Sequence, residues 1–183
     1  PAHSASASYT LTFPTTDGSA DEFLKTDGSG NLSWATAGGG NTPIFQARMG
    51  SSQSLSNGST TKVDFDTEVL DTASAYDPTT NQRFTVPSGQ AGKYFIHAKI
   101  TFGDLASTDA AEIIRMYKNG SQVAIGVRRT VGSTGRDGTI AVSQIIDLSV
   151  SDYIEIYGYT NGGNVTLSNA SEQNVFEGFK LGE

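Results

Sequence analysis

The sequence has 183 residues, of which 36% are hydrophobic and 17% are charged. This composition excludes an intrinsically disordered protein whose charges prevent folding. It has no cysteine, which excludes disulfides, cysteine-based zinc sites and thiol catalysis. The formal net charge of −7 argues against nonspecific binding to nucleic acid or to an anionic membrane, so we expect no nucleic-acid partner.

Residues 1–40 predict a short β stem and a linker. A strand is expected over 9–13, where polar and apolar residues alternate before Pro14. Two Thr-Asp-Gly-Ser turns start at Thr16 and Thr26, and the Gly-Gly-Gly-Asn of 38–41 predicts a linker. The few apolar residues of this segment are too small a set for one chain to bury. We therefore expect subunit contacts around a common axis through Phe23, Leu24 and Trp34.

Residues 41–183 predict a head domain that is β almost throughout. Strands are expected over 44–49, 62–66, 83–86, 93–102, 112–118, 122–129, 139–147, 152–159 and 174–181. Within 93–102 every even position is apolar, which places one face of this strand in a core. Only 105–112 is compatible with a turn of helix. Many short strands without helices predict a sandwich or a barrel.

The loop lengths predict where the head binds a ligand. The connections at 103–111, 130–138 and 160–173 are long, whereas those at 119–120 and 148–151 are tight. In an antiparallel run, successive connections alternate between the two ends, so the three long loops share one end. Long loops at one end of a rigid sandwich commonly carry binding function. The candidate ligand-binding residues are Asp104, Asp109, Arg129, Arg136, Asp137, Asn161, Asn164 and Asn169.

These candidates suit different ligands. Arg128, Arg129 and Arg136 form a basic patch for the phosphate or carboxylate groups of a surface polysaccharide, unless they pair with nearby acids such as Asp137. The asparagines, with nearby serines, suit hydrogen bonds to neutral sugars.

Three tyrosines alternate with small or apolar residues near the C-terminus. If Ile154 and Ile156 face the core, then Tyr153, Tyr157 and Tyr159 form an aromatic stripe on the opposite face. We expect this stripe to be a subunit interface, the alternative being that it lies under neighbouring loops.

Short motifs in the head resemble a known family in their order and spacing. They are Phe45-Gln-Ala47, Val63-Asp-Phe65, Phe84-Thr-Val-Pro87, Gly92-Lys-Tyr-Phe95, Tyr117-Lys-Asn-Gly120, Asp147-Leu148, Asp152-Tyr-Ile154 and Phe176-Glu-Gly178. Residues 43–183 thereby resemble the globular head of complement-type and tumour-necrosis-factor-like proteins, which implies a trimeric ten-strand jelly-roll β-sandwich. The family's Gly-Asp before the penultimate strand is Ser151-Asp152 here, and no collagen-like stalk precedes the head.

Residues 9–34 are similar to a segment that recurs in phage tail-fibre and virion proteins. This resemblance implies a homotrimeric receptor-binding protein of a bacteriophage tail fibre, extracellular on the virion. Its expected partners are a host cell-surface polysaccharide or outer-membrane receptor and, through a part before Pro1, other tail proteins. Two alternatives are a structural virion protein, such as a capsid decoration or head fibre, and a polysaccharide-degrading enzyme.

No residues are expected to be catalytic or to hold a metal. His3 lies in a polar tail and His97 on the polar side of a strand, without a neighbouring nucleophile in the sequence. A glycosidase would need two carboxylates across a cleft, which Asp104 with Asp109, or Asp137 with one of them, could supply, but solvated loop acids are far commoner. The run Asp27-Gly-Ser-Gly-Asn31 begins like a calcium loop but has Leu32 and Gly38 where Gly and Glu are required. Calcium near the trimer axis, which related heads sometimes hold, is the one metal that the resemblance allows.

Overall fold

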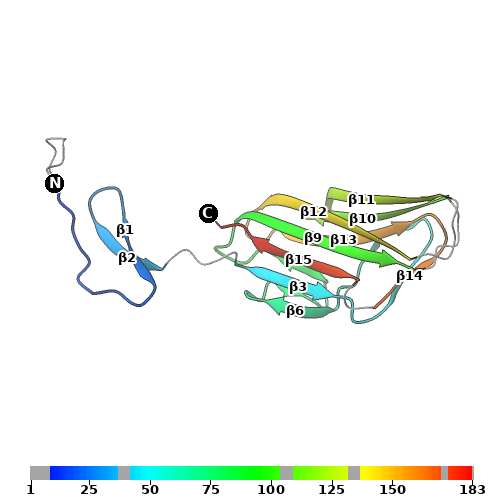
Figure 1. The fold of residues 1–183 in the computed structure, drawn as a ribbon, viewed down its shortest axis with the longest axis horizontal. Coiled ribbons are helices and arrows are strands. Elements are labelled where there is room, and N and C mark those ends of the chain that lie inside the picture. Colours follow the sequence, from blue (N-terminus) through cyan, green and yellow to red (C-terminus); the bar gives the residue numbers. More distant parts are fainter. Residues whose placement is uncertain (1–8, 37–41, 104–108, 132–136, 170–172, 183) are drawn as a thin grey trace. The chain divides into compact units, whose positions relative to one another are not determined.

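The computed structural model describes residues 9–36, 42–103, 109–131, 137–169 and 173–182. The chain divides into two compact units, Pro1–Gly40 with Gly182–Glu183, and Asn41–Leu181, which we call the head. All regular secondary structure in the described residues is β (Figure 1). These residues form no helix that is long and apolar enough to cross a membrane.

The N-terminal unit contains one hairpin. Strand β1 (Glu22–Thr26) pairs antiparallel with β2 (Leu32–Thr36) around the second of the predicted turns. Of the strand predicted over 9–13, only Thr12 pairs, in a parallel bridge with Asn31, so that prediction was too long. A two-stranded hairpin buries too little surface to be stable alone.

The head contains two sheets built from many short and a few long strands. These are β3 (Ile44–Arg48), β4 (Gln53–Leu55), β5 (Thr61–Lys62), β6 (Thr67–Asp71), β7 (Tyr76–Asp77), β8 (Arg83–Thr85), β9 (Gly92–Phe102), β10 (Asp109–Lys118), β11 (Ser121–Val131), β12 (Gly138–Leu148), β13 (Tyr153–Thr160), β14 (Val165–Leu167) and β15 (Val175–Lys180). Sheet 1 has the order β11-β10-β13-β8-β7, with β5 beside β13. Sheet 2 has the order β4-β14-β9-β15-β3-β6. Strands β14 and β15 pair with one edge of β9, and β12 pairs with its opposite edge. Every strand pairing is antiparallel.

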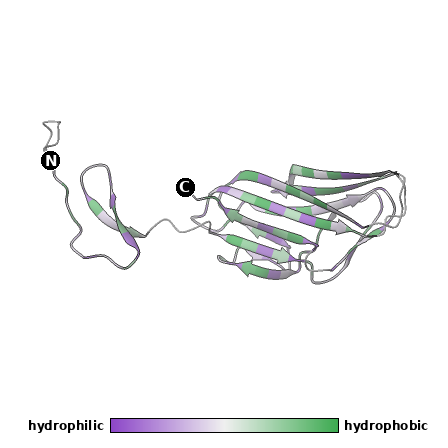
Figure 2. Cartoon of the chain, in the orientation of Figure 1, coloured by the Kyte–Doolittle hydropathy of each residue, from purple (hydrophilic) through white to green (hydrophobic). Residues whose placement is uncertain are grey.

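The core lies between the two sheets. The alternation predicted for β9 is confirmed, since Tyr94, Ile96, Ala98, Ile100 and Phe102 are all fully buried. Hydrophobic and hydrophilic positions alternate along several of the strands (Figure 2). Large aromatic side chains fill one half of the core, where Phe45 stacks on Phe84 at 4.5 Å between ring centroids and meets Phe176 edge-on at 4.9 Å.

Two predictions about local structure were wrong. Residues 109–112 begin strand β10 and form no helical turn, because Ala110, Glu112, Ile114 and Met116 alternate into the interior; residues 105–108 lie outside the described part. The strand predicted over 62–66 ends at Lys62, and four short strands, β4, β6, β7 and β14, were missed.

Candidate functional site

Three connections leave the head at the same end, which we call the loop end. The last residue of β9, Phe102, pairs with both Gly138 of β12 and Leu167 of β14. Similarly, Glu112 near the start of β10 pairs with Thr160 at the end of β13. The connections after β9, β11 and β13 therefore start side by side, as predicted from the alternation of the connections. The third predicted loop, 160–173, is not one long loop, because strand β14 interrupts it and pairs with β4 and β9.

The chain enters and leaves the head at the opposite end. The amide of Lys180 donates to the carbonyl of Pro43 at 3.0 Å, and Leu181 donates to Lys93 at 2.8 Å. The tight turns at 119–120 and 149–152 also lie at this end, because Lys118 pairs with Ser121 and with Ile154. The loop end is thus the part of the head farthest along the strands from Pro43.

The predicted ligand-binding residues are only partly placed. Asp104 and Arg136 lie outside the described residues, and of Asp109 only the backbone is described, as the first residue of β10. The remaining five are exposed at or beside the loop end, and they are Arg129, Asp137, Asn161, Asn164 and Asn169.

Two of these asparagines shape the loop itself. The Asn161 side-chain oxygen accepts from the amide of Ala111 at 2.6 Å, and its backbone amide donates to the Ala111 carbonyl. The Asn164 oxygen accepts from the amide of Asn57 at 2.9 Å, while Asn57 accepts from Gly163. These amide oxygens therefore hold the connection in place.

Sequence reasoning missed Asn174, which anchors the connection between β14 and β15. Its fully buried side chain accepts from the amide of Thr101 at 2.6 Å and donates to the carbonyl of Ser168. Asparagine is common in loops, so nothing local in the sequence distinguishes this buried one from its exposed neighbours.

Arg128 does not contribute to the expected basic patch, because its side chain points inward. Its Nε lies 2.9 Å from the carboxylate of Glu112, whose side chain is fully buried. Burial raises the pKa of Glu112, and the Arg128 charge partly opposes that rise. The guanidinium lies against Gly138, where a Cβ would collide with it. Arg129, the next residue, points outward and is exposed.

The outward face of sheet 2 carries the second group of exposed side chains, which we call the apolar face. A cross-strand row runs from Ile145 through Phe95 and Phe179 to Ile44, and Leu70 lies beyond on β6. Ile145 is 61% exposed and Leu70 is 46% exposed. The Phe95 and Phe179 rings lie 5.5 Å apart between centroids.

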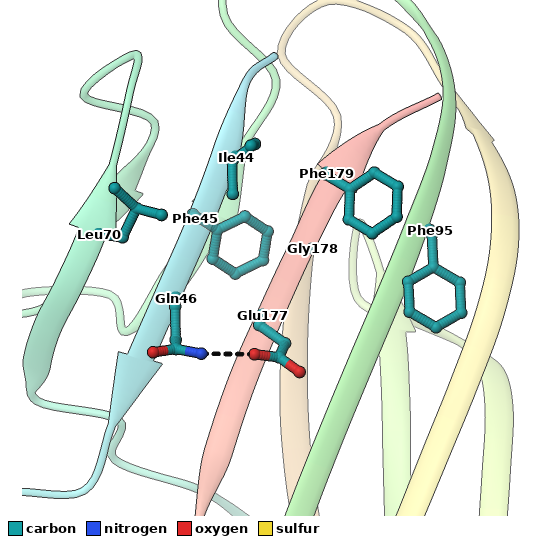
Figure 3. Close-up of a pocket in the computed structure, with 8 residues that line it drawn as sticks. All are labelled: Ile44, Phe45, Gln46, Leu70, Phe95, Glu177, Gly178 and Phe179. Atoms are coloured by element: carbon teal, nitrogen blue, oxygen red, sulfur yellow. Dashed lines mark hydrogen bonds between the residues drawn. The ribbon is translucent and has the colours of Figure 1, made fainter. Parts of the chain in front are cut away.

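A pocket of about 270 Å³ opens on the apolar face (Figure 3). It is lined mostly by apolar residues around Gly178, and Gln46 donates to the Glu177 carboxylate at 2.6 Å along one side. This pocket is remote from the loop end, since Ile44 and Phe179 pair next to Pro43.

His97 lies in the next row of the same face. Its Nδ1 is 2.9 Å from the Ser143 hydroxyl, a neighbour that the sequence alone did not indicate. Glu177 is opposite His97 in register, but among the described residues no carboxylate is hydrogen-bonded to the imidazole. A triad requires a carboxylate that orients the base, so this row does not form one.

The tyrosines point outward from sheet 1, as predicted from the burial of Ile154 and Ile156. Each has a neighbour within its own chain. The Arg83 guanidinium lies 4.2 Å from the centre of the Tyr153 ring, and that of Arg115 lies 5.2 Å from the centre of the Tyr159 ring. Tyr157 packs on Tyr117 at 4.6 Å between centroids. Their role in subunit contact stays a prediction.

The predicted contact residues of the N-terminal unit differ in exposure. Phe23 is 46% exposed and Leu24 is 39% exposed. Trp34 is half-buried, because its ring lies against Gly18 and its Nε1 donates to the carbonyl of Thr16 at 2.8 Å.

The run that resembles a calcium loop, residues 27–31, forms a turn whose polar groups hydrogen-bond to one another. The Asp27 carboxylate accepts from the amide of Ser29 at 2.7 Å and from the Asn31 side chain at 2.7 Å. These hydrogen bonds lower the pKa of Asp27. The described residues contain no group of three or more acidic or histidine side chains placed to hold a metal ion.

Comparisons with known proteins identify the architecture. No protein-family model matches the sequence, and no curated protein matches it. Solved structures do match: Eiger TNF from S. frugiperda has a TM-score of 0.56 at 11% identity, over 75% of this chain and 90% of that one. Murine APRIL has a TM-score of 0.56 at 14% identity, over 75% and 98%. The globular domain of zebrafish complement 1qA has a TM-score of 0.53 at 14% identity, over 76% and 97%.

The head is a jelly roll of the tumour-necrosis-factor and complement 1q type. The predicted all-β sandwich of two antiparallel sheets is thereby confirmed. At these identities the likeness concerns the fold, and one fold carries many functions. The trimer, the receptor and the phage origin remain predictions.

Proposed function

We propose that the protein is the receptor-binding end of a bacteriophage tail fibre, a homotrimer that attaches to a glycan or protein on the host surface through the loop end. The observation that carries this proposal is the position of the three connections. They converge at the end of a rigid sandwich opposite Pro43 and Lys180. A head tethered at that end presents the loops to whatever the fibre meets.

Two exposed apolar surfaces support self-association. The first is the apolar face, and the second is a stripe on edge strand β11 formed by Val123, Ile125 and Val127, of which Val127 is 52% exposed. The two surfaces belong to different sheets of the same subunit. In the proposed contact, the β11 stripe of one subunit packs on the apolar face of the next, which is a head-to-tail arrangement. Repeated head-to-tail contacts form a ring when the rotation closes, and we propose closure at three subunits.

Trimerisation strengthens weak attachment. A ring of three heads carries three copies of each loop, so contacts that are weak individually act together. We propose that attachment involves no catalysis, because among the described residues no carboxylate is hydrogen-bonded to His97.

Binding of the labelled trimer to host cells tests the loop end. The variant combines Asp104→Ser, Asp137→Ser and Asn169→Ala, one change in each connection, and we expect cell binding to fall at least about tenfold from the loss of polar contacts. The matched control combines Lys93→Ser, Asp147→Ser and Gln122→Ala, three exposed polar positions at the opposite end. Equal binding of both variants would reject the loop end as the receptor site.

Location on the particle separates this proposal from a structural virion part. Immunogold labelling is expected at the distal ends of tail fibres. Labelling confined to the capsid surface would favour a decoration protein instead.

A further inference from the structure

The outward side of sheet 1 carries an aromatic surface that borders the β11 stripe, since Ile125 pairs with Arg115. It contains the half-buried side chains of four tyrosines, and we call it the tyrosine face: Tyr117, Tyr153, Tyr157 and Tyr159. Tyr117 is on β10 and the other three are on the neighbouring strand β13. Their rings therefore lie on one continuous side of the sheet.

Two arginines of this face form no ion pair with the acidic residues that the structure describes. Arg83 lies over the Tyr153 ring, and Arg115 lies over the Tyr159 ring while its Nη1 donates to the Thr60 hydroxyl at 2.8 Å. The buried Nε of Arg115 has no hydrogen-bond acceptor in the described part of the chain. Among the described residues, neither guanidinium has a carboxylate within ion-pair distance. Buried or half-buried arginines are usually paired with a carboxylate. Because these two are not paired in that way, their charges are available to an anionic ligand.

Other charged side chains of the face form ion pairs, so their charges cancel. Lys62 lies 2.7 Å from Glu155, and Lys118 lies 2.8 Å from Asp152. Asp77 is opposite Arg83 in register, but its carboxylate accepts from Thr79, Thr80 and Asn81 of its own turn. The face therefore retains positive charge in a chain whose formal net charge is −7.

We propose that the tyrosine face is a second, lateral binding site for a polysaccharide that carries carboxylate groups. Planar guanidinium groups bind carboxylates through paired hydrogen bonds, and flat aromatic rings pack against the apolar faces of sugar rings. The cation–π contacts hold the tyrosine rings and the arginines in fixed relative positions, so little conformational freedom is lost on binding.

Two other uses of the face fit the observations less well. Subunit contact is better served by the apolar face and the β11 stripe, which carry no charge and include the exposed side chains of Ile145, Leu70 and Val127. Nucleic acid is disfavoured by the overall negative charge of the chain.

Affinity electrophoresis of the whole protein tests the site, with polygalacturonate, neutral dextran or double-stranded DNA cast in the gel. We expect retardation by polygalacturonate alone. The double variant Arg83→Gln with Arg115→Gln should weaken this binding at least about tenfold. The matched control, Lys25→Gln with Lys93→Gln, removes two exposed positive charges from other surfaces and should bind as the unchanged protein does.

Tyr157→Ser separates a ligand site from a subunit interface. We expect weaker polygalacturonate binding with an unchanged molar mass in light scattering and unchanged circular dichroism. Loss of the trimer in this variant would assign the face to subunit contact and overturn the proposal. Equal retardation by dextran or DNA, or loss of binding in the loop-end triple variant alone, would overturn it as well.

Discussion

The Glu112 carboxylate is fully buried at the loop end, and Arg128 is its ion-pair partner. Burial makes the folded protein hold the proton of this carboxyl more tightly than the unfolded chain does. The contribution of Glu112 to stability is therefore greatest below its ordinary pKa of 4.5 and falls as the pH rises through the raised value. Arg128 limits that fall by favouring the charged form.

The variant Arg128→Ala is expected to lose roughly 3 kcal/mol of unfolding free energy near neutral pH, because it leaves a buried charge unpaired. In mildly acid solution the loss should shrink, since a protonated Glu112 needs no counter-charge. Urea unfolding at the two pH values measures both quantities, with Arg129→Ala as the exposed control. An equal loss at both pH values would mean that Arg128 acts through the packing of its stem instead.

At the scale of elements, the connection from β14 to β15 depends on one buried side chain. Asn174 joins Thr101 of β9 to Ser168 of the connection, so it fixes the loop to sheet 2. The loop-end surface formed by this connection is thus held by a residue that does not itself face solvent.

Replacing Asn174 with Ala is expected to cost about 1–3 kcal/mol, because the buried amide of Thr101 loses its acceptor. Hydrogen exchange should become faster at Thr101 and along 165–169, while the strands of sheet 1 keep their protection. Asn169→Ala, an exposed asparagine in the same connection, provides the control. Unchanged exchange at Thr101 would show that water replaces the side chain without loss.

The sequence predicts elements well where one face of a strand is buried. Strand β9 was predicted because its even positions are uniformly apolar, and the outward tyrosines were predicted from Ile154 and Ile156. Strand β6 was missed because it is an edge strand whose residues are mostly exposed, so no alternation marks it. The inward turn of Arg128 and the arginines over the tyrosines depend on partners from other strands, and such contacts leave no local pattern.

At the scale of the whole molecule, assembly should depend on the apolar face. The variant Ile145→Asp changes a side chain that is 61% exposed, so the monomer fold is expected to tolerate it. In the proposed ring this position is covered, and burying an aspartate there should raise the dissociation constant roughly a hundredfold. Light scattering over a dilution series measures the change.

Val150→Asp is the matched control, because Val150 is 44% exposed in the turn before β13. Val127→Asp on the β11 stripe should reproduce the effect of Ile145→Asp, since the two surfaces meet in the proposed contact. A trimer that withstands both changes but dissociates with Tyr157→Ser would return the interface to the tyrosines.

The hydrogen bond between Lys180 and Pro43 has a practical consequence, because it places the beginning and the end of the head next to each other. A domain with adjoining ends can be inserted into a surface hairpin of a carrier protein without distorting either partner. In such a chimera the long connections would project from the host scaffold, which offers a display format for selecting altered recognition from randomised sequences.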